Sequence, residues 1–254
     1  MTEFKRGVAI VAGGSGGIGS QICRVLAKAG ANVAFTYRSR SDVADAVTAS
    51  IEAEGQKAFA MQVDHADENA MKQFVDAAVE QFGRIHSVVY AAGPHLALRL
   101  LSETTPAEWR NVVDADVNGA FNLVWATLPQ LKAGGGGAYV AVITAAVEKV
   151  PMRDICSAAP KAAIEMLFRG IALEEGRHSI RSNCVAPGFI NAGMGAELIT
   201  KPGIEDWVER LRKTLPMKSF GDASDIAEAV LFLLSTRSKY ISGQSLAVDG
   251  GLQL

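Results

Sequence analysis

Short apolar runs rich in β-branched residues recur along the chain at nearly regular intervals. Seven of them have the length of buried strands, at Val8–Val11, Val33–Thr36, Ala58–Val63, Val88–Ala91, Tyr139–Ile143, Ser182–Ala186 and Ser245–Val248. Between them lie stretches with the periodicity of amphipathic helices, for example Ile18–Ala29, Met71–Phe82 and Ala162–Leu173. This alternation implies right-handed crossovers. It predicts an α/β fold with a doubly wound parallel sheet of about seven strands and helices on both faces.

The rest of the composition sets bounds on the class of protein. No linker, composition break or repeat interrupts the alternation, so we expect residues 1–254 to form a single domain. The net charge of −2 gives no reason to expect nucleic acid or a membrane as partner. Three scattered cysteines without a C-x-x-C suggest neither a disulfide framework nor a metal site. With no signal-peptide pattern and no apolar run near the ~20 residues of a spanning helix, we expect a cytoplasmic protein.

A glycine-rich turn follows the first predicted strand and leads into the first predicted helix. Its sequence is Gly13-Gly14-Ser15-Gly16-Gly17-Ile18-Gly19. Glycines in this position let backbone N–H groups approach a pyrophosphate, and the N-terminus of the helix adds partial positive charge. Glycine turns are common, so the prediction depends on the strand and helix around this one. In that context the turn indicates a dinucleotide-binding site.

The end of the second predicted strand distinguishes between dinucleotides. Sites for NAD place an acidic residue here, which accepts hydrogen bonds from the free ribose 2′-hydroxyl. This chain has Tyr37 at that position, followed by Arg38 and Ser39. Arg38 can pair bidentately with a 2′-phosphate, and Ser39 can add a hydroxyl donor. The alternative is a solvated surface arginine, but the pattern favours NADP(H).

Further motifs follow in a fixed order: Asp64, Ala91-Ala92-Gly93, Asn183-Cys184-Val185-Ala186-Pro187-Gly188 and Val248-Asp249-Gly250-Gly251. With the glycine turn they resemble the short-chain dehydrogenase/reductase family over essentially the whole chain. The resemblance implies a Rossmann-type fold and an oxidoreductase in which Asp64 hydrogen-bonds the adenine amino group. It also implies cofactor contacts from Gly13, Ser15, Gly17, Ile18, Gly19, Ala92, Gly93, Lys161, Pro187, Gly188 and Ile190.

The family's active-site pattern is altered in this chain. Family members use a Tyr-x-x-x-Lys pair, in which the tyrosine protonates the carbonyl oxygen while hydride arrives from nicotinamide. The lysine is present as Lys161, but Ser157 stands at the tyrosine position. The family's asparagine corresponds to Asp116, and its serine corresponds to Thr144, or to Ala145 if the loop is one residue shorter. The predicted catalytic set is therefore Asp116, Thr144, Ser157 and Lys161.

The chemistry of this set differs from that of the family. A serine hydroxyl is far less acidic than a phenol and shorter by a ring, so Ser157 cannot inherit the tyrosine's role. Lys161 remains a donor to the nicotinamide ribose. Asp116 could pair with Lys161 through water, or act as an acid if desolvation raises its pKa. Structural alternatives are a helix-surface carboxylate for Asp116 and a hydroxyl that satisfies backbone at a helix N-terminus for Ser157. The tyrosines Tyr37, Tyr90, Tyr139 and Tyr240 are expected to lie outside the pocket.

Two branches of the family offer partial precedents. The 2,4-dienoyl-CoA reductase branch also lacks the tyrosine and keeps the lysine: one type resembles Ser157-x-x-x-Lys161 and Asn118, and another resembles Asp116. A bacterial enoyl-acyl-carrier reductase type spaces tyrosine and lysine seven residues apart, and Asp154 occupies that place here. The resemblance implies a small-molecule substrate with a carbonyl or an enoyl- or dienoyl-type system.

Other classes of function stay open at this point. One is a homologue that binds NADP(H) but is catalytically weak or silent. Another is a non-redox lyase or isomerase that uses Asp116 or His95 as base. Family members commonly pair through their fourth and fifth helices, here about Pro106–Leu131 and Ser157–Glu174. The resemblance therefore implies a homo-oligomer, either a dimer or a tetramer.

Overall fold

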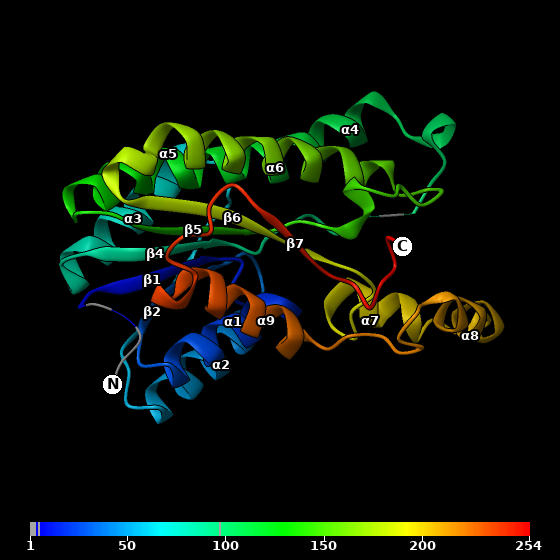
Figure 1. Cartoon of the computed structure of the whole chain (residues 1–254), viewed down its shortest axis with the longest axis horizontal. Helices are drawn as coiled ribbons and strands as arrows, with labels where there is room; N and C mark the ends of the chain where they lie inside the picture. Colours follow the sequence, from blue (N-terminus) through cyan, green and yellow to red (C-terminus); the bar gives the residue numbers. More distant parts are fainter. Residues whose placement is uncertain (1–3, 5, 97) are drawn as a thin grey trace.

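One parallel sheet forms the centre of the molecule (Figure 1). The structure, a computed structural model, describes residues 4, 6–96 and 98–254. Its seven strands are β1 (Val8–Ala12), β2 (Asn32–Tyr37), β3 (Ala58–Gln62), β4 (Ile85–Tyr90), β5 (Gly137–Val142), β6 (Ile180–Pro187) and β7 (Ser245–Val248). Their order is β3-β2-β1-β4-β5-β6-β7, and every neighbouring pair is parallel. The predicted fold class is confirmed, and the ends of the predicted strands are within three residues of the observed ones.

Helices cover both faces of the sheet (Figure 1). On one face lie α1 (Gly17–Lys28), α2 (Ser41–Ala53) and α9 (Ala223–Leu234). On the other lie α3 (Glu68–Phe82), α5 (Gly119–Ala133) and α6 (Ile155–Glu175). The strands are apolar on both sides because each side is buried: on β1, Ile10 packs toward α3, α5 and α6, whereas Val11 packs toward α1, α2 and α9.

Three further helices lie beyond the carboxyl ends of the strands or lead into α5. They are α4 (Pro106–Val113), α7 (Gly193–Ile199) and α8 (Glu205–Thr214). The helix expected over about Pro106–Leu131 is observed as one uninterrupted helical run from Pro106 to Ala133, but it is not regular. A π-helical turn, Asp114–Asn118, separates α4 from α5, and single π turns of this kind are frequent at functional sites.

The reversal of strand order determines where a ligand can bind. β1 pairs with β2 on one side and with β4 on the other, so the connections leave the sheet in opposite directions at this point. Parallel sheets of this kind open a crevice at the carboxyl ends of the strands where the order reverses. The glycine turn after β1, the residues after β2 and Ala91–Gly93 after β4 all lie there. No described helix is both long and apolar enough to span a bilayer.

Candidate active site

The glycine turn is shaped by close backbone approaches. Gly13 has a positive φ of 85°, which a residue with a side chain rarely adopts. A Cβ at Gly19 would collide with the Gly13 carbonyl oxygen, and one at Gly17 would collide with the backbone N of Gly193 in α7. Within the described residues, the first-turn N–H groups of Ile18 and Gly19 have no hydrogen-bond acceptor. The turn therefore leaves backbone donors and the positive end of α1 free for an anionic group.

A buried hydroxyl holds the turn in place. The backbone N of Gly13 donates to Thr36 Oγ1 over 3.0 Å, and Thr36 Oγ1 lies 2.7 Å from Nε2 of His65. The His65 ring is enclosed by Thr36, Tyr90 and Gly119. Desolvation lowers the pKa of His65 to about 4. The ring is therefore neutral at physiological pH. Its contact with Thr36 holds the hydroxyl that accepts the hydrogen bond from the glycine turn.

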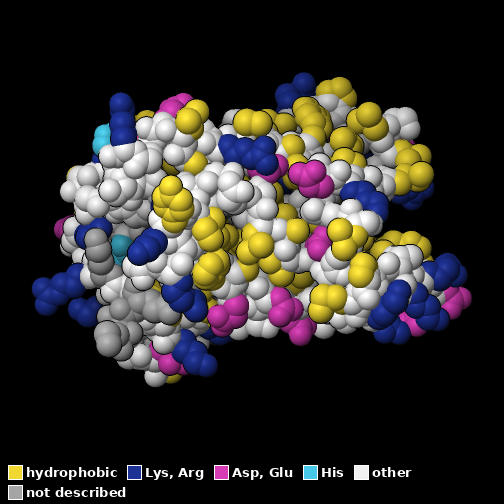
Figure 2. Space-filling view, in the orientation of Figure 1, with side chains coloured by type: hydrophobic (Ala, Val, Ile, Leu, Met, Phe, Trp, Pro, Cys, Tyr) yellow, Lys and Arg dark blue, Asp and Glu magenta, His cyan; other side chains and the backbone are white. Residues whose placement is uncertain are grey.

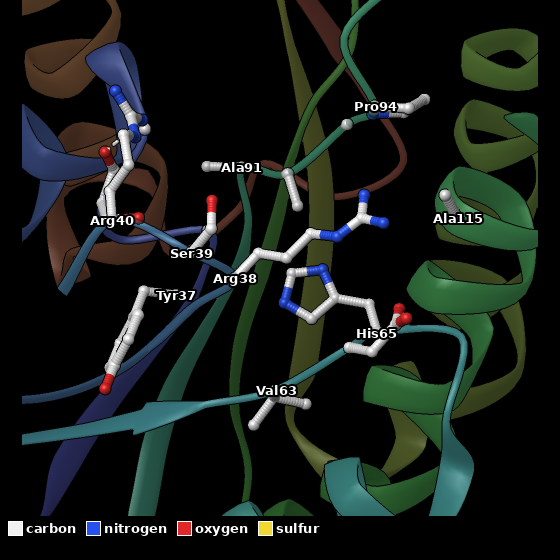
Figure 3. Close-up of a pocket in the computed structure, with 15 residues that line it drawn as sticks. Tyr37, Arg38, Ser39, Arg40, Val63, His65, Ala91, Pro94 and Ala115 are labelled. Atoms are coloured by element: carbon white, nitrogen blue, oxygen red, sulfur yellow. Dashed lines mark hydrogen bonds between the residues drawn. The ribbon is translucent and has the colours of Figure 1, made fainter.

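A cleft of about 170 Å³ opens between the glycine turn, the end of β2 and the end of β4 (Figure 3). The predicted residues that line it are Gly13, Ser15, Tyr37, Arg38, Ser39, Asp64, Ala92 and Gly93. Figure 3 shows Arg38 extending across the cleft toward His65 and Ala115, while the Tyr37 ring points away. Asp64 lies at the rim, where its carboxylate accepts a hydrogen bond from the backbone N of Ala66.

Two residues with polar side chains line this cleft although they were not expected from the sequence. Arg40 donates through Nη2 to the backbone oxygen of Ser15, so a second guanidinium is attached to the glycine turn. His65 is the other. The position of Arg40 two residues after Arg38 could have suggested it, because the predicted second strand ends at the same edge of the sheet as the glycine turn.

The predicted residues after β6 are placed differently. Ile190 is buried in the core on the α1, α2 and α9 side and forms an isolated bridge with Gly221. Pro187 ends β6, and a Cβ on Gly188 would collide with Asp249. These three residues lead the chain back over the carboxyl edge to α7, which begins directly after Ala192 and contacts Gly17.

A buried ion pair lies beside the cleft. Lys161 Nζ lies 2.7 Å from Asp116 Oδ1 and donates to the backbone oxygen of Ala92 over 3.0 Å. The exposed fraction of the two side chains is 12% for Lys161 and 2% for Asp116. A helix-surface position for Asp116 is therefore wrong, and so is a pair mediated by water. The π-helical turn brings Asp116 inward to face α6.

Tyr90 contacts this ion pair from the core, although, as expected, it lines neither of the two cavities described for this site. Its hydroxyl lies 2.9 Å from the backbone oxygen of Asp116 and 3.2 Å from Oδ1, and Lys161 Nζ is 5.4 Å from the centre of its ring. Burial, together with the charge of Asp116, raises the pKa of Tyr90 well above its usual range. The phenol therefore remains a hydrogen-bond donor that holds Asp116, and it does not titrate near neutrality.

Ser157 and Thr144 stand apart from this pair. Ser157 lies in the first turn of α6, where its backbone N donates to the backbone oxygen of Asp154 over 3.0 Å. Its hydroxyl makes no hydrogen bond with any residue the structure describes, so the expected alternative of backbone capping is not observed. Thr144 does cap: its hydroxyl accepts from the backbone N of Ala146 over 3.2 Å. Neither hydroxyl bonds to Lys161 within the described part of the chain.

A second, larger cavity of about 550 Å³ adjoins the cleft. The two share Arg38, Asp64, Pro94 and Ala115. The rest of the lining comes from the loops after β3 and β4, from α4 and the π-helical turn, and from the start of α6: Ala66, His95, Leu96, Arg99, Thr104, Glu108, Asn111, Val112, Asp114 and Cys156. His95 also lies 2.9 Å from Glu197 of α7, and both side chains are exposed. The cavity has room for part of a small molecule beside the first turn of α6.

Comparison with known proteins covers nearly the whole chain. A family model described as Enoyl-(Acyl carrier protein) reductase matches residues 12–253. The 3-oxoacyl-[acyl-carrier-protein] reductase FabG of Staphylococcus epidermidis is 33% identical over 249 residues, 97% of this chain and 98% of that protein. The peroxisomal 2,4-dienoyl-CoA reductase [(3E)-enoyl-CoA-producing] of Arabidopsis thaliana is 32% identical over 256 residues, 97% of this chain and 84% of that protein.

Solved structures show the same architecture. A blue fluorescent protein from a metagenomic library, in complex with NADPH, is 35% identical with a TM-score of 0.87, covering 96% of this chain and 97% of that one. Carveol dehydrogenase from Mycobacterium avium, in complex with NAD, is 29% identical with a TM-score of 0.90, covering 99% of each chain.

Proposed function

This chain belongs to the short-chain dehydrogenase/reductase family of oxidoreductases, and we propose that it is an NADP(H)-dependent reductase of a small carbonyl or an enoyl- or dienoyl-type compound. The observation that carries the proposal is the Lys161–Asp116 pair beside the nucleotide cleft. The pair keeps the family's lysine in position although the family's tyrosine is replaced by Ser157.

The residues around the cleft fit a dinucleotide with a 2′-phosphate. The glycine turn leaves backbone donors free for a pyrophosphate. No carboxylate stands at the end of β2; Tyr37 does, and the Arg38 guanidinium makes no hydrogen bond or ion pair with the described residues. A free guanidinium is a bidentate partner for phosphate. The solved relatives bind NADPH in one case and NAD in another, so Arg38 is the main support for NADP(H).

Lys161 keeps one donor for the ligand. An ammonium group has three N–H donors, and Asp116 and the Ala92 carbonyl engage two of them. We propose that the third binds the ribose next to the nicotinamide. Asp116, held by Tyr90, fixes the position of the ammonium and balances its charge. NADPH, when bound, would supply a hydride to the substrate.

The nature of the substrate is supported by the second cavity and by the relatives. The cavity begins at Cys156, next to Ser157, and extends along α4. The relatives named above act, by their names, on 3-oxoacyl and 2,4-dienoyl thioesters. Both names describe an acyl group with a reducible function close to its carbonyl end, a 3-oxo group in one and a 2,4-diene in the other, and we extend this substrate class to this chain.

A second function is supported by the loss of the tyrosine. The Lys161 charge is neutralised at 2.7 Å by Asp116, and the Ser157 hydroxyl is too weak an acid to replace a phenol. A protein of this kind could bind NADP(H) without turning substrate over and act as a sensor or partner subunit.

The test is incubation of the protein and NADPH with 3-oxoacyl, 2-enoyl and 2,4-dienoyl thioesters and with cyclic ketones. Oxidation of NADPH, which is monitored as a loss of its absorbance, supports the proposal that the protein is a reductase. Tight NADPH binding without oxidation of any substrate supports the silent homologue. A product formed without any change in NADPH would instead favour a lyase or isomerase and contradict both.

A further inference from the structure

Asp154 stands directly before α6, the helix that carries Ser157 and Lys161. Ser157 and Lys161 are four residues apart and share one face of α6, and Asp154 stands at the N-cap, three residues before Ser157. Parallel strand β5 ends at the carboxyl edge of the sheet, and α6 begins there after the loop that contains Thr144. Asp154 is therefore on the cleft end of the helix, about 10 Å along its axis from Lys161.

The Asp154 carboxyl has no partner among the residues described, although it is partly buried. Asp67 provides a comparison, because it occupies the same position before α3. Asp67 accepts hydrogen bonds from the backbone N of Asn69 and of Ala70, over 2.9 and 3.0 Å. Asp154 makes no such bond and forgoes the roughly 1 kcal/mol that a capping side chain contributes.

The backbone before Asp154 is held in a rare conformation. Arg153 has a φ of 71°, and its carbonyl oxygen accepts a hydrogen bond from the backbone N of Arg99 over 3.1 Å. A non-glycine residue in this region is strained, and such residues persist where the surrounding structure holds the backbone, often at active sites. The contact also ties the start of α6 to the loop that lines the larger cavity.

Burial alone raises the pKa of Asp154 to about 6. Charged groups on the loops and on α4 around the start of α6 are His95, Arg99, Glu103, Glu108, Arg110, Glu148, Lys149 and Arg153. None of them forms an ion pair with Asp154, and Arg99 is paired with Glu108 at 2.9 Å. A carboxylic acid of this kind exchanges protons near neutral pH, as a catalytic acid must.

The other candidates are less suited to donate a proton. Tyr90 is fully buried with a pKa raised well above its usual range, and Asp116 is occupied by Lys161 and Tyr90. The Ser157 hydroxyl is not acidic enough. We propose that Asp154 is the catalytic acid that gives the substrate its proton, in place of the tyrosine that the family uses; this rests on the proposed reductase function.

The step balances in atoms and charge. The substrate receives a hydride, with two electrons, from reduced nicotinamide at one carbon of its C=O or conjugated C=C system. The displaced π electrons form a bond to the proton that leaves the Asp154 carboxyl, at the oxygen or at the distant carbon. The Asp154 carboxylate then takes a proton from water, so each turnover consumes one NADPH and one solvent proton. The Ser157 hydroxyl, which bonds to none of the described residues, can position the substrate, or a water between the substrate and Asp154.

Asp154→Asn is the decisive variant, because it keeps the shape of the side chain and removes the acid. We expect kcat/KM for the best substrate of the panel to fall by about 10²–10⁴-fold, with NADPH affinity unchanged. In the wild type, kcat/KM should fall as pH rises through about 6, since the protonated form is the donor. The variant should lose this dependence, and Asp154→Glu should retain it with reduced activity.

Two controls separate a catalytic role from a structural one. Asp67→Asn exchanges the equivalent residue before α3 and should leave kcat/KM and its pH profile unchanged, since asparagine caps as well as aspartate. Carbon-13 NMR of labelled aspartate carboxyls, without cofactor or substrate, should show one group that titrates near pH 6 in the wild type and is missing in Asp154→Asn.

The outcomes are distinguishable from failure of the proposed function. If the wild type reduces substrates and Asp154→Asn does so within threefold, Asp154 is not the acid and the reductase assignment stands. The same holds if no carboxyl titrates near pH 6. If the wild type oxidises NADPH with none of the substrates, the reductase assignment falls, and the role of Asp154 falls with it.

Discussion

The Lys161–Asp116 pair combines a cost in stability with a role in function. Both charges are removed from water, which is expensive, and each depends on the other for compensation. Removing one partner of a buried pair leaves an uncompensated charge, whereas removing both with apolar groups of similar volume is often neutral. Stability and activity can therefore be separated at this site.

We expect Lys161→Met alone to lower the free energy of unfolding by about 3–5 kcal/mol, because Asp116 is left unpaired. The double variant Lys161→Met with Asp116→Leu should recover most of this loss but no reductase activity. Denaturant titration of the two variants and the wild type measures the free energies of unfolding. Equal stability of the single and double variants would show that the pair does not hold the fold.

Substitution of the two polar groups separately tests their roles in turnover. Lys161→Ala should abolish turnover and weaken NADPH binding, since it removes the donor to the ribose. Ser157→Ala should lower kcat less than tenfold, because its hydroxyl is a poor acid. Asp116→Asn keeps an acceptor for Lys161 but removes its counter-charge, so it should lower turnover less than Lys161→Ala while also lowering the free energy of unfolding. Loss of turnover in Ser157→Ala, with Lys161→Ala and Asp116→Asn unaffected, would contradict this view of the site.

The two arginines after β2 should differ in their effects on nucleotide binding. Arg38→Ala should weaken NADPH binding by one to two powers of ten and leave NADH binding unchanged, because a charge-assisted contact to phosphate contributes roughly 1.5–3 kcal/mol. Arg40→Ala should weaken both nucleotides alike, because Arg40 holds the glycine turn through the Ser15 carbonyl. Fluorescence titration with both nucleotides decides. Equal affinity of the wild type for NADPH and NADH would exclude a 2′-phosphate site.

At the scale of elements, α7 meets the glycine turn without room for a side chain. A Cβ at Gly17 would collide with the backbone N of Gly193 at the start of α7. Gly17→Ala should therefore displace α7 and raise the dissociation constants of NADPH and NADH by tenfold or more. Gly176→Ala is the matched control, because its φ of −55° and open surroundings accept a methyl group. An unchanged affinity in Gly17→Ala would show that α7 moves away at no cost.

The elements themselves could be predicted from the sequence because their periodicities are strong. Strands buried on both faces give continuous apolar runs. The glycine turn Gly13–Gly19 follows such a run and precedes a helical pattern, which is the arrangement of a dinucleotide-binding turn. The π-helical turn at Asp114–Asn118 could not be predicted, because one extra residue per turn changes the apolar pattern very little. Without knowledge of this turn, the sequence did not show whether the Asp116 side chain faces solvent or the core.

Side-chain contacts across the sheet were equally hidden. Tyr90 ends β4 and lies inside the core. There it contacts Asp116, which belongs to the π-helical turn between α4 and α5. His65 reaches Thr36 across 29 residues of sequence. Neither contact leaves a local pattern, because both depend on how β2, β3 and β4 stack at the carboxyl edge. The residues could be named from the sequence, but which ones meet could not.

At the scale of the whole molecule, three groups whose pKa values are shifted by desolvation give stability a predictable dependence on pH. Burial lowers the pKa of His65 and of His86 to about 4, so the unfolded chain binds more protons than the folded one between pH 4 and 6.5. Their contribution is complete above pH 6.5 and is lost as pH falls. Asp154 acts in the opposite sense: its pKa is raised, so its contribution is complete at low pH and is lost as pH rises through about 6.

Since two histidines outweigh one carboxyl, we expect the free energy of unfolding to be about 2 kcal/mol lower at pH 5 than at pH 7.5. His86→Gln should reduce this loss, because it removes one titrating ring and keeps a hydrogen-bonding group beside Ser87. Asp154→Asn should enlarge it. Urea titrations at the two pH values provide the measurement, and a protein more stable at pH 5 would contradict the assignment.

Two exposed apolar surfaces indicate how copies of the protein associate. β7 is the edge strand of the sheet, and three of its four residues are exposed, with Leu246 at 41%. Figure 2 shows hydrophobic side chains gathered across the middle of this face, where Figure 1 places β7. A second set lies on the helices: Phe121 and Trp125 of α5, and Met166 and Leu173 of α6, all exposed. Apolar surface of this extent on a folded chain indicates association.

We therefore expect a homo-oligomer in which one or both of these surfaces are covered by a second copy. If both are covered, the protein is a tetramer, and Trp125→Glu and Leu246→Glu should each reduce it to a dimer, because each places a charge in one interface only. If one is covered, a single variant should give monomers and the other should have no effect. Light scattering at micromolar concentration measures the mass. A wild type at the monomer mass of 26.8 kDa would contradict the prediction, since both surfaces would then be exposed to water.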